Sequence, residues 1–435
     1  MGQTDQLGER VRGLRIAAGL SQTDLAAGRF SKEYVSQIER GKTRPTPDTM
    51  AWLADRLDVD TAFLASGVSA TVRARWEAVL ARAEALVEQH RLSEAVAEFD
   101  SALAGIETLG ASDLGFRAVA GKGWAVMELG ELPRAIELLQ SARALAESPQ
   151  FTDVERADVL FRLGVCRYKL SSVSTAIALF DEALKLAERS NLPCDLLRAD
   201  ILGWRSRCYR RQRDYLAARE DVERALELAE ALSNPRTAAN VYFQASLVAE
   251  REGHLGLART YAERAKACYE DISDRENVGR LLNNLGGLTF QLGKPEEAVS
   301  YLQDALRALL DEGSDIEAAH VVCSLAEVHL GMGRFEEAEA EARKSLELLA
   351  DRVDYVYEIG TAQLALGRSL IEQDRLEEAQ DILRSADRSF EQFASAGHRA
   401  AAWVAMGDLA TRRGDDRGAA RLYRRAAEAL QDVRF

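Results

Sequence analysis

The sequence predicts an all-α protein in two parts: a small N-terminal bundle of five helices over residues 1–66, and an α-solenoid of about nine long helix pairs over residues 72–435. Between residues 20 and 44, two short helical stretches follow one another closely, each preceded by a serine. After residue 72, small residues recur with a period of about 40 residues. No segment shows the alternation of apolar and polar residues that is typical of half-buried strands.

The first predicted helix belongs to the small domain. Leu7, Val11, Leu14 and Ala18 recur at helical spacing and fall on one face, and Gly19 ends the helix. This helix should therefore bury one face against the rest of the bundle.

Two short helices are predicted next, within residues 20–44. Ser21 and Ser31 are good N-caps, because a serine hydroxyl accepts a hydrogen bond from the free amides of a first turn, and Gly28 separates the two helices. In the second of them Val35 and Ile38 are three residues apart and point inward. The side chains left facing outward are Lys32, Glu33, Ser36, Gln37 and Arg40. A short capped helix with long polar side chains near its start fits the major groove of DNA.

The motifs Gly-Leu-Ser-Gln at 19–22 and Tyr-Val-Ser-Gln-Ile-Glu-Arg-Gly at 34–41 resemble those of the phage-repressor-like (Xre-type) helix-turn-helix domain. The resemblance covers residues 7–64. It implies that Gln22 contacts DNA, that the first residues of the third helix read bases, and that Arg15 pairs with Glu39. The turn at residues 27–30 is about one residue shorter than is usual in that family, which bears on the angle of the third helix.

The charge of the small domain is balanced, with nine Lys and Arg and nine Asp and Glu in residues 1–66. The basic residues nevertheless gather on the turn, the third helix and the loop after it. We expect the DNA-binding residues to be Gln22, Arg29, Ser31, Lys32, Glu33, Ser36, Gln37, Arg40, Lys42 and Arg44. The alternative is a helix-turn-helix that contacts only protein. Phosphate contacts dominate affinity for nucleic acid, and a domain without net charge attracts phosphates weakly.

The remaining helices complete the small domain. Pro45 and Pro47 bracket Thr46 before a fourth helix, whose apolar side chains include Met50 and Leu53, and Phe63 and Leu64 close the domain. Residues 67–71 are predicted to form a short linker, too short for the two parts to move independently.

From residue 72 onward the chain repeats. A small residue in the second helix of each unit recurs at intervals of 40 to 42 residues, at Ala95, Ala135, Ala176, Ala218, Ala258, Ala298, Ala338, Ala379 and Ala419. Further small residues lie twelve positions before and seven positions after each of these marks. Small residues at such offsets let two antiparallel helices approach closely.

These units resemble the tetratricopeptide repeat, as in Leu285-Gly286, Leu292-Gly293 and Glu297-Ala298. The usual period is 34 residues, so each helix pair here is longer than standard. The longer period is similar to that of bacterial peptide-sensing (RRNPP-like) regulators and of related scaffold proteins.

In this repeat family the first helix of each pair lines the concave groove. The resemblance implies that effector-binding positions include Arg162, Trp204, Arg207, Asn240, Gln244, Arg280, Asn283, Asn284 and His320. A carboxamide can donate to and accept from an extended backbone, and arginine offers a planar fork to a carboxylate or phosphate. A peptide with a free C-terminus or an acidic residue would suit such a groove. The alternative is an ordinary polar groove without a specific ligand.

Other functional classes find little support in the sequence. The five cysteines are scattered and odd in number, the five histidines are isolated, and there is no P-loop, dinucleotide fingerprint or nucleophile motif. No run approaches the roughly 18 apolar residues of a membrane span, and the polar N-terminus is no signal peptide. We therefore expect a cytoplasmic protein that is not an enzyme and holds neither cofactor nor metal.

The net charge of −14 lies entirely after residue 66, so the solenoid should repel DNA and leave the small domain to approach it. The first hypothesis is a sequence-specific DNA-binding transcriptional regulator, a homodimer on a palindromic operator, whose repeats bind a peptide or small-molecule effector that alters operator binding. The second hypothesis is a protein-interaction scaffold or adaptor with weak or no specific DNA binding.

Overall fold

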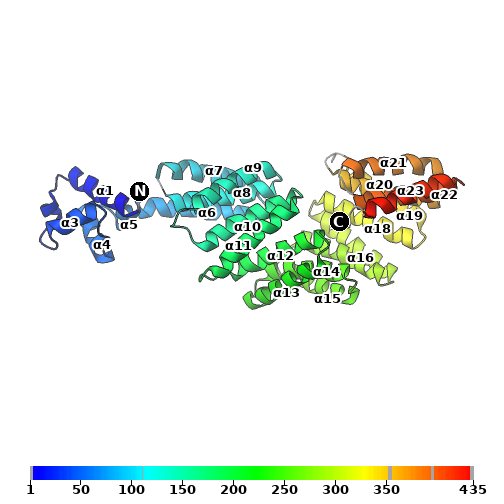
Figure 1. Ribbon diagram of the computed structural model, residues 1–435, viewed down its shortest axis with the longest axis horizontal. Coiled ribbons are helices and arrows are strands. Elements are labelled where there is room, and N and C mark those ends of the chain that lie inside the picture. Colours follow the sequence, from blue (N-terminus) through cyan, green and yellow to red (C-terminus); the bar gives the residue numbers. More distant parts are fainter. Residues whose placement is uncertain (1–2, 110, 351–354, 393–395, 432–435) are drawn as a thin grey trace. The chain divides into compact units, whose positions relative to one another are not determined.

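The structure is a computed structural model, which describes residues 3–109, 111–350, 355–392 and 396–431. Over these residues it contains 23 α-helices and one short 3-10 helix, and no strand (Figure 1). The predicted fold class is confirmed. The chain divides into two compact units, residues 1–197 and residues 198–435.

The first five helices form the N-terminal helix bundle, called the head below. They are α1 (Gln3–Ala17), α2 (Gln22–Ala26), α3 (Lys32–Glu39), α4 (Pro47–Arg56) and α5 (Thr61–Ser66). Their core contains the apolar residues expected from the spacing, with Val11, Leu25 and Leu53 fully buried. Ala18 differs from the expectation, because α1 ends at Ala17 and Ala18 is exposed in the turn that follows.

Helix pairs fill the rest of the first unit. They are α6 (Ala70–Glu88) with α7 (Leu92–Ile106), α8 (Ser112–Glu128) with α9 (Leu132–Ala146), and α10 (Asp153–Lys169) with α11 (Val173–Arg189). The 3-10 helix η1 (Glu107–Leu109) follows α7.

Helix α12 (Asp195–Arg211) begins in the first unit and continues into the second. The helices after it are α13 (Tyr215–Leu232), α14 (Pro235–Arg251), α15 (Leu255–Asp271), α16 (Arg275–Gln291), α17 (Pro295–Asp311), α18 (Asp315–Gly331), α19 (Phe335–Leu348), α20 (Val356–Glu372), α21 (Leu376–Gln392), α22 (Ala396–Arg412) and α23 (Asp416–Gln431). With α6–α11 they make nine consecutive pairs within the described residues, as the repeat spacing predicts.

The repeated small residues form the seam inside each pair. All nine marks, from Ala95 to Ala419, are buried. Where the first helix carries glycine, a large side chain four residues after the mark takes up the space: a Cβ added at Gly286 would lie 2.6 Å from Leu302, and one at Gly164 would lie 2.5 Å from Phe180. At these seams, a large side chain of the second helix therefore packs directly against a glycine of the first.

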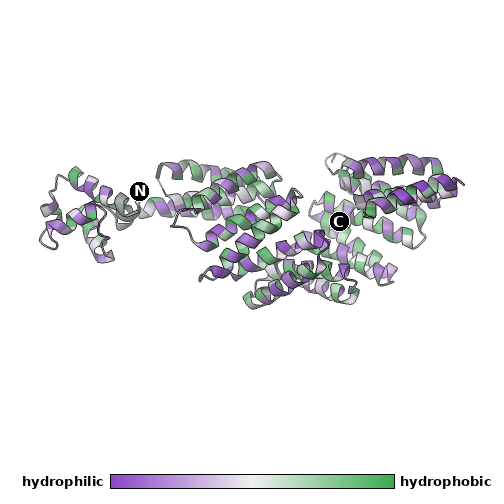
Figure 2. Cartoon of the chain, viewed as in Figure 1, coloured by the Kyte–Doolittle hydropathy of each residue, from purple (hydrophilic) through white to green (hydrophobic). Residues whose placement is uncertain are grey.

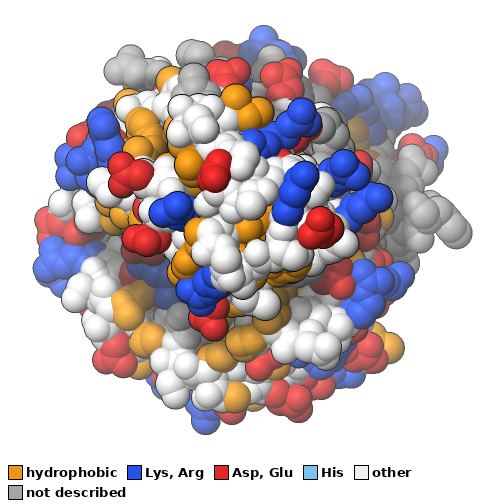
Figure 3. Space-filling view, turned by 90° about the vertical axis from the view of Figure 1, so that its left-hand side faces the viewer, with side chains coloured by type: hydrophobic (Ala, Val, Ile, Leu, Met, Phe, Trp, Pro, Cys, Tyr) orange, Lys and Arg blue, Asp and Glu red, His pale blue; other side chains and the backbone are white. Residues whose placement is uncertain are grey.

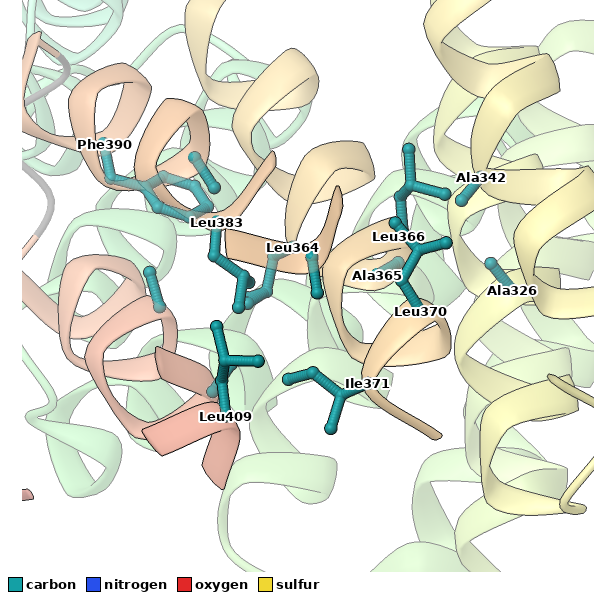
Figure 4. Close-up of a cluster of buried hydrophobic side chains, with 14 residues drawn as sticks. Ala326, Ala342, Leu364, Ala365, Leu366, Leu370, Ile371, Leu383, Phe390 and Leu409 are labelled. Carbon is teal, nitrogen blue, oxygen red and sulfur yellow. The ribbon is translucent and has the colours of Figure 1, made fainter. Parts of the chain in front are cut away.

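The seams join into continuous apolar clusters within a unit. In the second unit one cluster runs from Ala326 through Leu366 and Leu370 to Phe390 and Leu409, and Figure 4 shows these side chains converging from successive helices. Along each helix, hydrophobic and hydrophilic residues are interspersed, because only part of the surface faces the seams (Figure 2).

Ion pairs connect neighbouring repeats on the surface. Arg259 Nη2 contacts Glu297 Oε1 at 3.0 Å, and Arg375 Nη1 contacts Glu339 Oε2 at 2.7 Å. Pairs with a similar separation in sequence include Arg143 with Glu182, Arg280 with Glu317, Arg334 with Glu296, and Arg412 with Glu372. Each exposed pair contributes about 0.2–1 kcal/mol at most, so packing in the seams dominates stability.

The junction between the head and the first repeat is short and anchored. Gly67 adopts a left-handed φ of 83°, and Val68 is only 2% exposed, within the same apolar cluster as Leu80 of α6. From α1, Arg10 Nε donates to the Leu64 carbonyl at 3.1 Å, and its Nη2 donates to the Ala65 carbonyl at 2.8 Å. Three residues, 67–69, thus separate α5 from α6, and one of them is buried.

Candidate nucleic-acid interface and ligand grooves

Helices α2 and α3 are fixed by their caps. Ser21 forms a reciprocal capping box with Asp24, and the Ser31 hydroxyl accepts from the Tyr34 amide at 3.1 Å. Between the helices the chain turns through Ala27, with φ 42°, and Gly28, with φ 74°. Two successive residues in the left-handed region reverse the chain in little space, as a tight turn requires.

A buried polar cluster locks α1, α2 and α3 together. Arg15 Nε donates to Glu39 Oε1 at 2.5 Å and its Nη2 to Oε2 at 3.2 Å, and this hydrogen bonding raises the pKa of Arg15. Gln22 Nε2 also donates to Glu39 Oε2, at 2.8 Å. The Gln22 amide nitrogen, expected at the DNA, is therefore partly committed to the interior.

Most of the expected DNA-binding side chains lie together on and after α3. Lys32, Glu33, Gln37, Arg40, Lys42 and Arg44 are exposed, and Ser36 is half-buried. Ser31 is the helix cap, and its hydroxyl is used there. In the described part of the chain, none of the basic residues Lys32, Arg40, Lys42 and Arg44 forms an ion pair.

Arg29 lies on an aromatic platform beside α3. Its guanidinium carbon is 5.7 Å from the centre of the Phe30 ring and 5.8 Å from that of Trp52. Phe30 and Trp52 meet edge to face, with centroids 5.1 Å apart. The aromatic pair restrains Arg29 without neutralising its charge.

The end of α3 folds back on itself. Gly41, with φ 68°, donates its amide to the Ile38 carbonyl, and Lys42 donates its amide to the Gln37 carbonyl at 2.9 Å. This is the Schellman pattern of hydrogen bonds. It brings Thr43 beside Gln37, where the Thr43 hydroxyl donates to Gln37 Oε1 at 3.1 Å.

The charged side chains on this end of the molecule are mixed. Figure 3 shows Lys and Arg scattered among Asp and Glu on this face, without one continuous basic patch. The view agrees with the balanced charge of residues 1–66. Five of the unpaired cations lie on or beside α3, at Arg29, Lys32, Arg40, Lys42 and Arg44, and Arg12 and Arg56 are also exposed and outside the ion pairs of the described residues.

A groove of about 640 Å³ opens on the first helices of the first three pairs. Its walls include Trp124 and Arg162, whose guanidinium carbon lies 5.4 Å from the Trp124 ring centre. Arg162 Nε donates to Asp158 Oδ2 at 2.7 Å. Of the expected effector residues only Arg162 lies in this groove. Trp124 is not among the expected effector residues, because periodicity does not separate a groove wall from a core.

A second pocket, of about 410 Å³, lies on α14, α16 and α18 in the second unit. Four expected residues line it together: Arg280, Asn283, Asn284 and His320. Arg280 pairs with Glu317 at 2.7 Å, and Asn284 Oδ1 accepts from Ser246 Oγ at 3.1 Å. The Asn283 Oδ1 atom is buried without a hydrogen-bond partner in the described part of the chain.

The other four expected groove residues line a much tighter space. Trp204, Arg207, Asn240 and Gln244 surround about 20 Å³, room for about one water. The Arg207 guanidinium lies 4.3 Å from the Trp204 ring centre, and Asn240 Oδ1 accepts from the Tyr269 hydroxyl at 2.6 Å. These side chains pack against one another more than they line an open site.

Two surveys of the described residues bear on other functions. No group of three or more His, Cys, Asp or Glu there could hold a metal ion. No helix among them combines the length and apolar character needed to cross a membrane. Burial raises the pKa of the Cys166 thiol to about 11 and that of Cys208 to about 12, so these thiols are poor nucleophiles.

Comparison with known families places both parts of the chain. Residues 6–66 match the helix-turn-helix domain. Tetratricopeptide-repeat models match residues 80–150, 121–193, 199–232, 237–311, 277–351 and 323–392. The chain thus carries a helix-turn-helix domain followed by tetratricopeptide repeats. None of the curated protein sequences matches it significantly.

Several solved structures share the fold. The quorum sensor NprR from B. thuringiensis is similar with a TM-score of 0.62 and 14% identity, over 83% of this chain and 99% of that one. A Rap protein, solved with competence and sporulation factor, gives a TM-score of 0.57 and 16% identity over 82% and 98%. A signal transduction ATPase with a tetratricopeptide repeat sensor from Pyrococcus horikoshii gives a TM-score of 0.58 and 15% identity over 98% and 63%.

Proposed function

We propose that this chain, a tetratricopeptide-repeat protein with an N-terminal helix-turn-helix domain, is a transcriptional regulator that binds DNA through α3 and responds to an effector bound by its repeats. One observation carries the proposal: α3 presents exposed polar and cationic side chains, and none of the cations there is neutralised by an ion pair among the described residues. Free cations are what phosphate contacts require, and a capped helix of this kind fits the major groove.

Specific binding requires more than one head. A single helix-turn-helix contacts few base pairs, and two copies on a palindromic site would give the affinity of a specific regulator. We therefore propose a homodimer on a two-fold symmetric operator. The repeats supply the second contact surface, since the head alone is small.

The pocket formed by α14, α16 and α18 is the best candidate for the effector. Asn283 Oδ1 is a buried acceptor without a partner in the described chain, and an extended peptide offers a backbone N–H to satisfy it. Arg280 and His320 lie in the same wall, next to the carboxylates of Glu317 and Glu358, so this wall presents both signs of charge to a ligand. NprR is a quorum sensor and the Rap protein was solved with competence and sporulation factor; this chain shares their fold.

The junction at residues 67–69 is the proposed route of coupling. With Val68 buried and Arg10 holding the end of α5, movement of the first repeat would reach the head instead of being absorbed by a flexible linker. An effector must prefer one arrangement of the heads to act in this way, because equal affinity for both shifts nothing. Insertion of a flexible Gly-Ser segment after Gly67 should abolish the response to effector and leave DNA binding intact.

The first experiment is selection of binding sites from random duplex DNA by the full-length protein, followed by titration at several salt concentrations. A regulator yields a symmetric site and affinity that falls with salt. Replacement of Lys32 and Gln37 by Ala should remove sequence selectivity. If the parent protein prefers no duplex over scrambled competitor, the scaffold function replaces this proposal.

The effector is tested separately with a library of synthetic heptapeptides with free C-termini, scored by the change in operator affinity. Asn283→Ala should abolish the response to an active peptide, and Asn191→Ala is the control, because that side chain is exposed and lines none of the three sites described above. A response that survives Asn283→Ala places the effector elsewhere.

A further inference from the structure

Gln22 and Gln37 are both among the expected DNA-binding residues, and they are hydrogen-bonded through opposite ends of their side-chain amides. Gln22 uses its amide nitrogen to donate to Glu39 Oε2, at 2.8 Å. Gln37 has its Oε1 engaged by the Thr43 hydroxyl at 3.1 Å. In the described part of the chain, Gln37 Nε2 has no hydrogen-bond partner, so both of its N–H donors are available.

The backbone enforces this orientation of Gln37. The loop after α3 is reversed at Gly41, whose φ of 68° suits glycine, and the Lys42 amide is bonded to the Gln37 carbonyl. Thr43 therefore follows directly after this turn and lies beside the side chain of Gln37, four residues before Gly41. Because Gln37 is exposed and Thr43 lies on its loop side, the amide nitrogen is the group turned away from the loop.

The four base pairs differ in what they offer such a donor. In the major groove guanine presents two acceptors, O6 and N7, whereas adenine presents the N7 acceptor beside the N6 donor. A glutamine reads adenine by donating to N7 and accepting from N6 at once. That mode requires Oε1 to face the base, whereas in this chain the hydrogen bond from Thr43 holds Oε1 toward the loop after α3.

Resting on the proposed function, we propose that Gln37 reads guanine in the operator, and that Thr43 is the positioning residue that sets this choice. Thr43 itself touches no base in this scheme. It selects the base by fixing which end of the Gln37 amide faces the groove. The pairing of the two residues, not Gln37 alone, is then the determinant of sequence at that position.

The test is binding-site selection from random duplexes with four full-length proteins: the parent, Gln37→Ala, Thr43→Val and Thr43→Ser. Gln37→Ala identifies the base pair that Gln37 reads, as the position whose preference disappears. At that position the parent should favour guanine over adenine by roughly tenfold to a hundredfold. Thr43→Val, which keeps the shape and removes the hydroxyl, should bring that ratio close to one.

Thr43→Ser is the matched rescue, because it retains the hydroxyl and should retain the preference for guanine. All four proteins should keep the same salt dependence of binding, since no phosphate contact is altered. A purely structural role for Thr43 would instead weaken binding to all sites equally.

The outcomes separate this inference from the function on which it rests. A parent protein that selects no sequence overturns the proposed function itself. If the parent selects a site, any of three results overturns the inference and leaves the proposed regulator in place. These are a preference for adenine at the position read by Gln37, no position that depends on Gln37, and an unchanged preference in Thr43→Val.

Discussion

The head and the repeats use arginine and lysine in opposite ways. In the repeats, cations such as Arg259, Arg334 and Arg375 are paired with carboxylates of a neighbouring repeat. In the described part of the head the single ion pair is Arg15 with Glu39, and it is internal. The surface cations of α3 are left free, although residues 1–66 carry as many acids as bases. Net charge therefore does not show which cations are available to a ligand, whereas the local pairing of each charge does.

The two parts also differ in what holds them together. The head has one small apolar core, and a single buried polar cluster joins three of its helices, whereas the repeats depend on many copies of one apolar seam. A single substitution should therefore damage the head severely and the repeats only locally. The predictions below test this contrast, from the largest expected effect to the smallest.

Loss of the buried polar cluster should unfold the head selectively. In Glu39→Ala, Arg15 keeps a charge in an environment where its side chain is only 12% exposed, and Gln22 loses its acceptor. Breaking a buried ion pair costs about 3–5 kcal/mol. Hydrogen exchange should accelerate over residues 3–66 and stay unchanged over the repeats.

The exposed Glu33, also on α3, gives the control, since Glu33→Ala should leave exchange unchanged. Equal acceleration in the head and the repeats of Glu39→Ala would show that the two parts unfold together, which the contrast forbids.

Removal of the free cations should weaken DNA binding strongly. With Arg40, Lys42 and Arg44 replaced by Ala, the slope of log affinity against log salt should fall by about 0.9 for each phosphate that is no longer neutralised. At moderate salt this amounts to roughly two to three orders of magnitude in affinity for three phosphates. Titration of the selected operator at several salt concentrations measures it.

A triple variant of paired cations in the repeats is the matched control. Arg334, Arg375 and Arg412 each contact a carboxylate of the neighbouring repeat, so their replacement by Ala should leave the slope unchanged. A fall in slope there would mean that the repeats also contact DNA.

Replacement of two neighbouring glycines in α16 by alanine should change the stability of the second unit in opposite directions. A Cβ at Gly286 would lie 2.6 Å from Leu302, whereas one at Gly287 would meet nothing within 4 Å. Gly286→Ala should destabilise the second unit by roughly 1–3 kcal/mol through overpacking. Gly287→Ala should stabilise it by up to about 1 kcal/mol, since alanine favours the helix. Urea unfolding followed by circular dichroism distinguishes the two, and a stabilised Gly286→Ala would contradict the tight seam.

The smallest effect concerns the ion pairs between repeats. Burial tends to raise the pKa of Glu339, but hydrogen bonds from Arg343, Gln373 and Arg375 outweigh it and lower that pKa below its usual value. A carboxylate with a lowered folded pKa stabilises the fold fully above its unfolded pKa, and this is lost as pH falls through the folded value. The repeats should therefore lose less than about 1 kcal/mol per pair below about pH 4.

Thermal unfolding measured from neutral pH to about pH 3 checks this, with Glu339→Gln as the comparison. The variant should be less stable at neutral pH and should converge with the parent in acid. A constant difference at every pH would mean that the charge of Glu339 plays no part.

Much of this protein was predictable because its signals are local or periodic. The nine small-residue marks, such as Ala258 and Ala298, predict the helix pairs, since a close helix approach requires small residues at fixed offsets. Ser21 and Ser31 likewise predict the starts of α2 and α3, because an N-cap acts within its own turn.

The candidate sites were less predictable. The groove positions were taken from the repeat spacing and from the family's groove-lining helix. The structure separates them into three places: Arg162 in the first groove, four residues in the pocket that includes Asn283, and four in the tight packing around Trp204. Spacing gives the face of a helix, but the size of the side chains on the neighbouring helix decides whether that face is open.

By itself, the sequence determined the helical class, the repeat and the position of α3, because these depend on residues close together or at a constant interval. Only the tertiary structure decided which polar groups remain available. The Gln22 amide is taken up by Glu39 from α3, and the side-chain carbonyl of Gln37 by Thr43 across a turn. Those choices depend on distances of about 3 Å between side chains that come together only when the chain has folded.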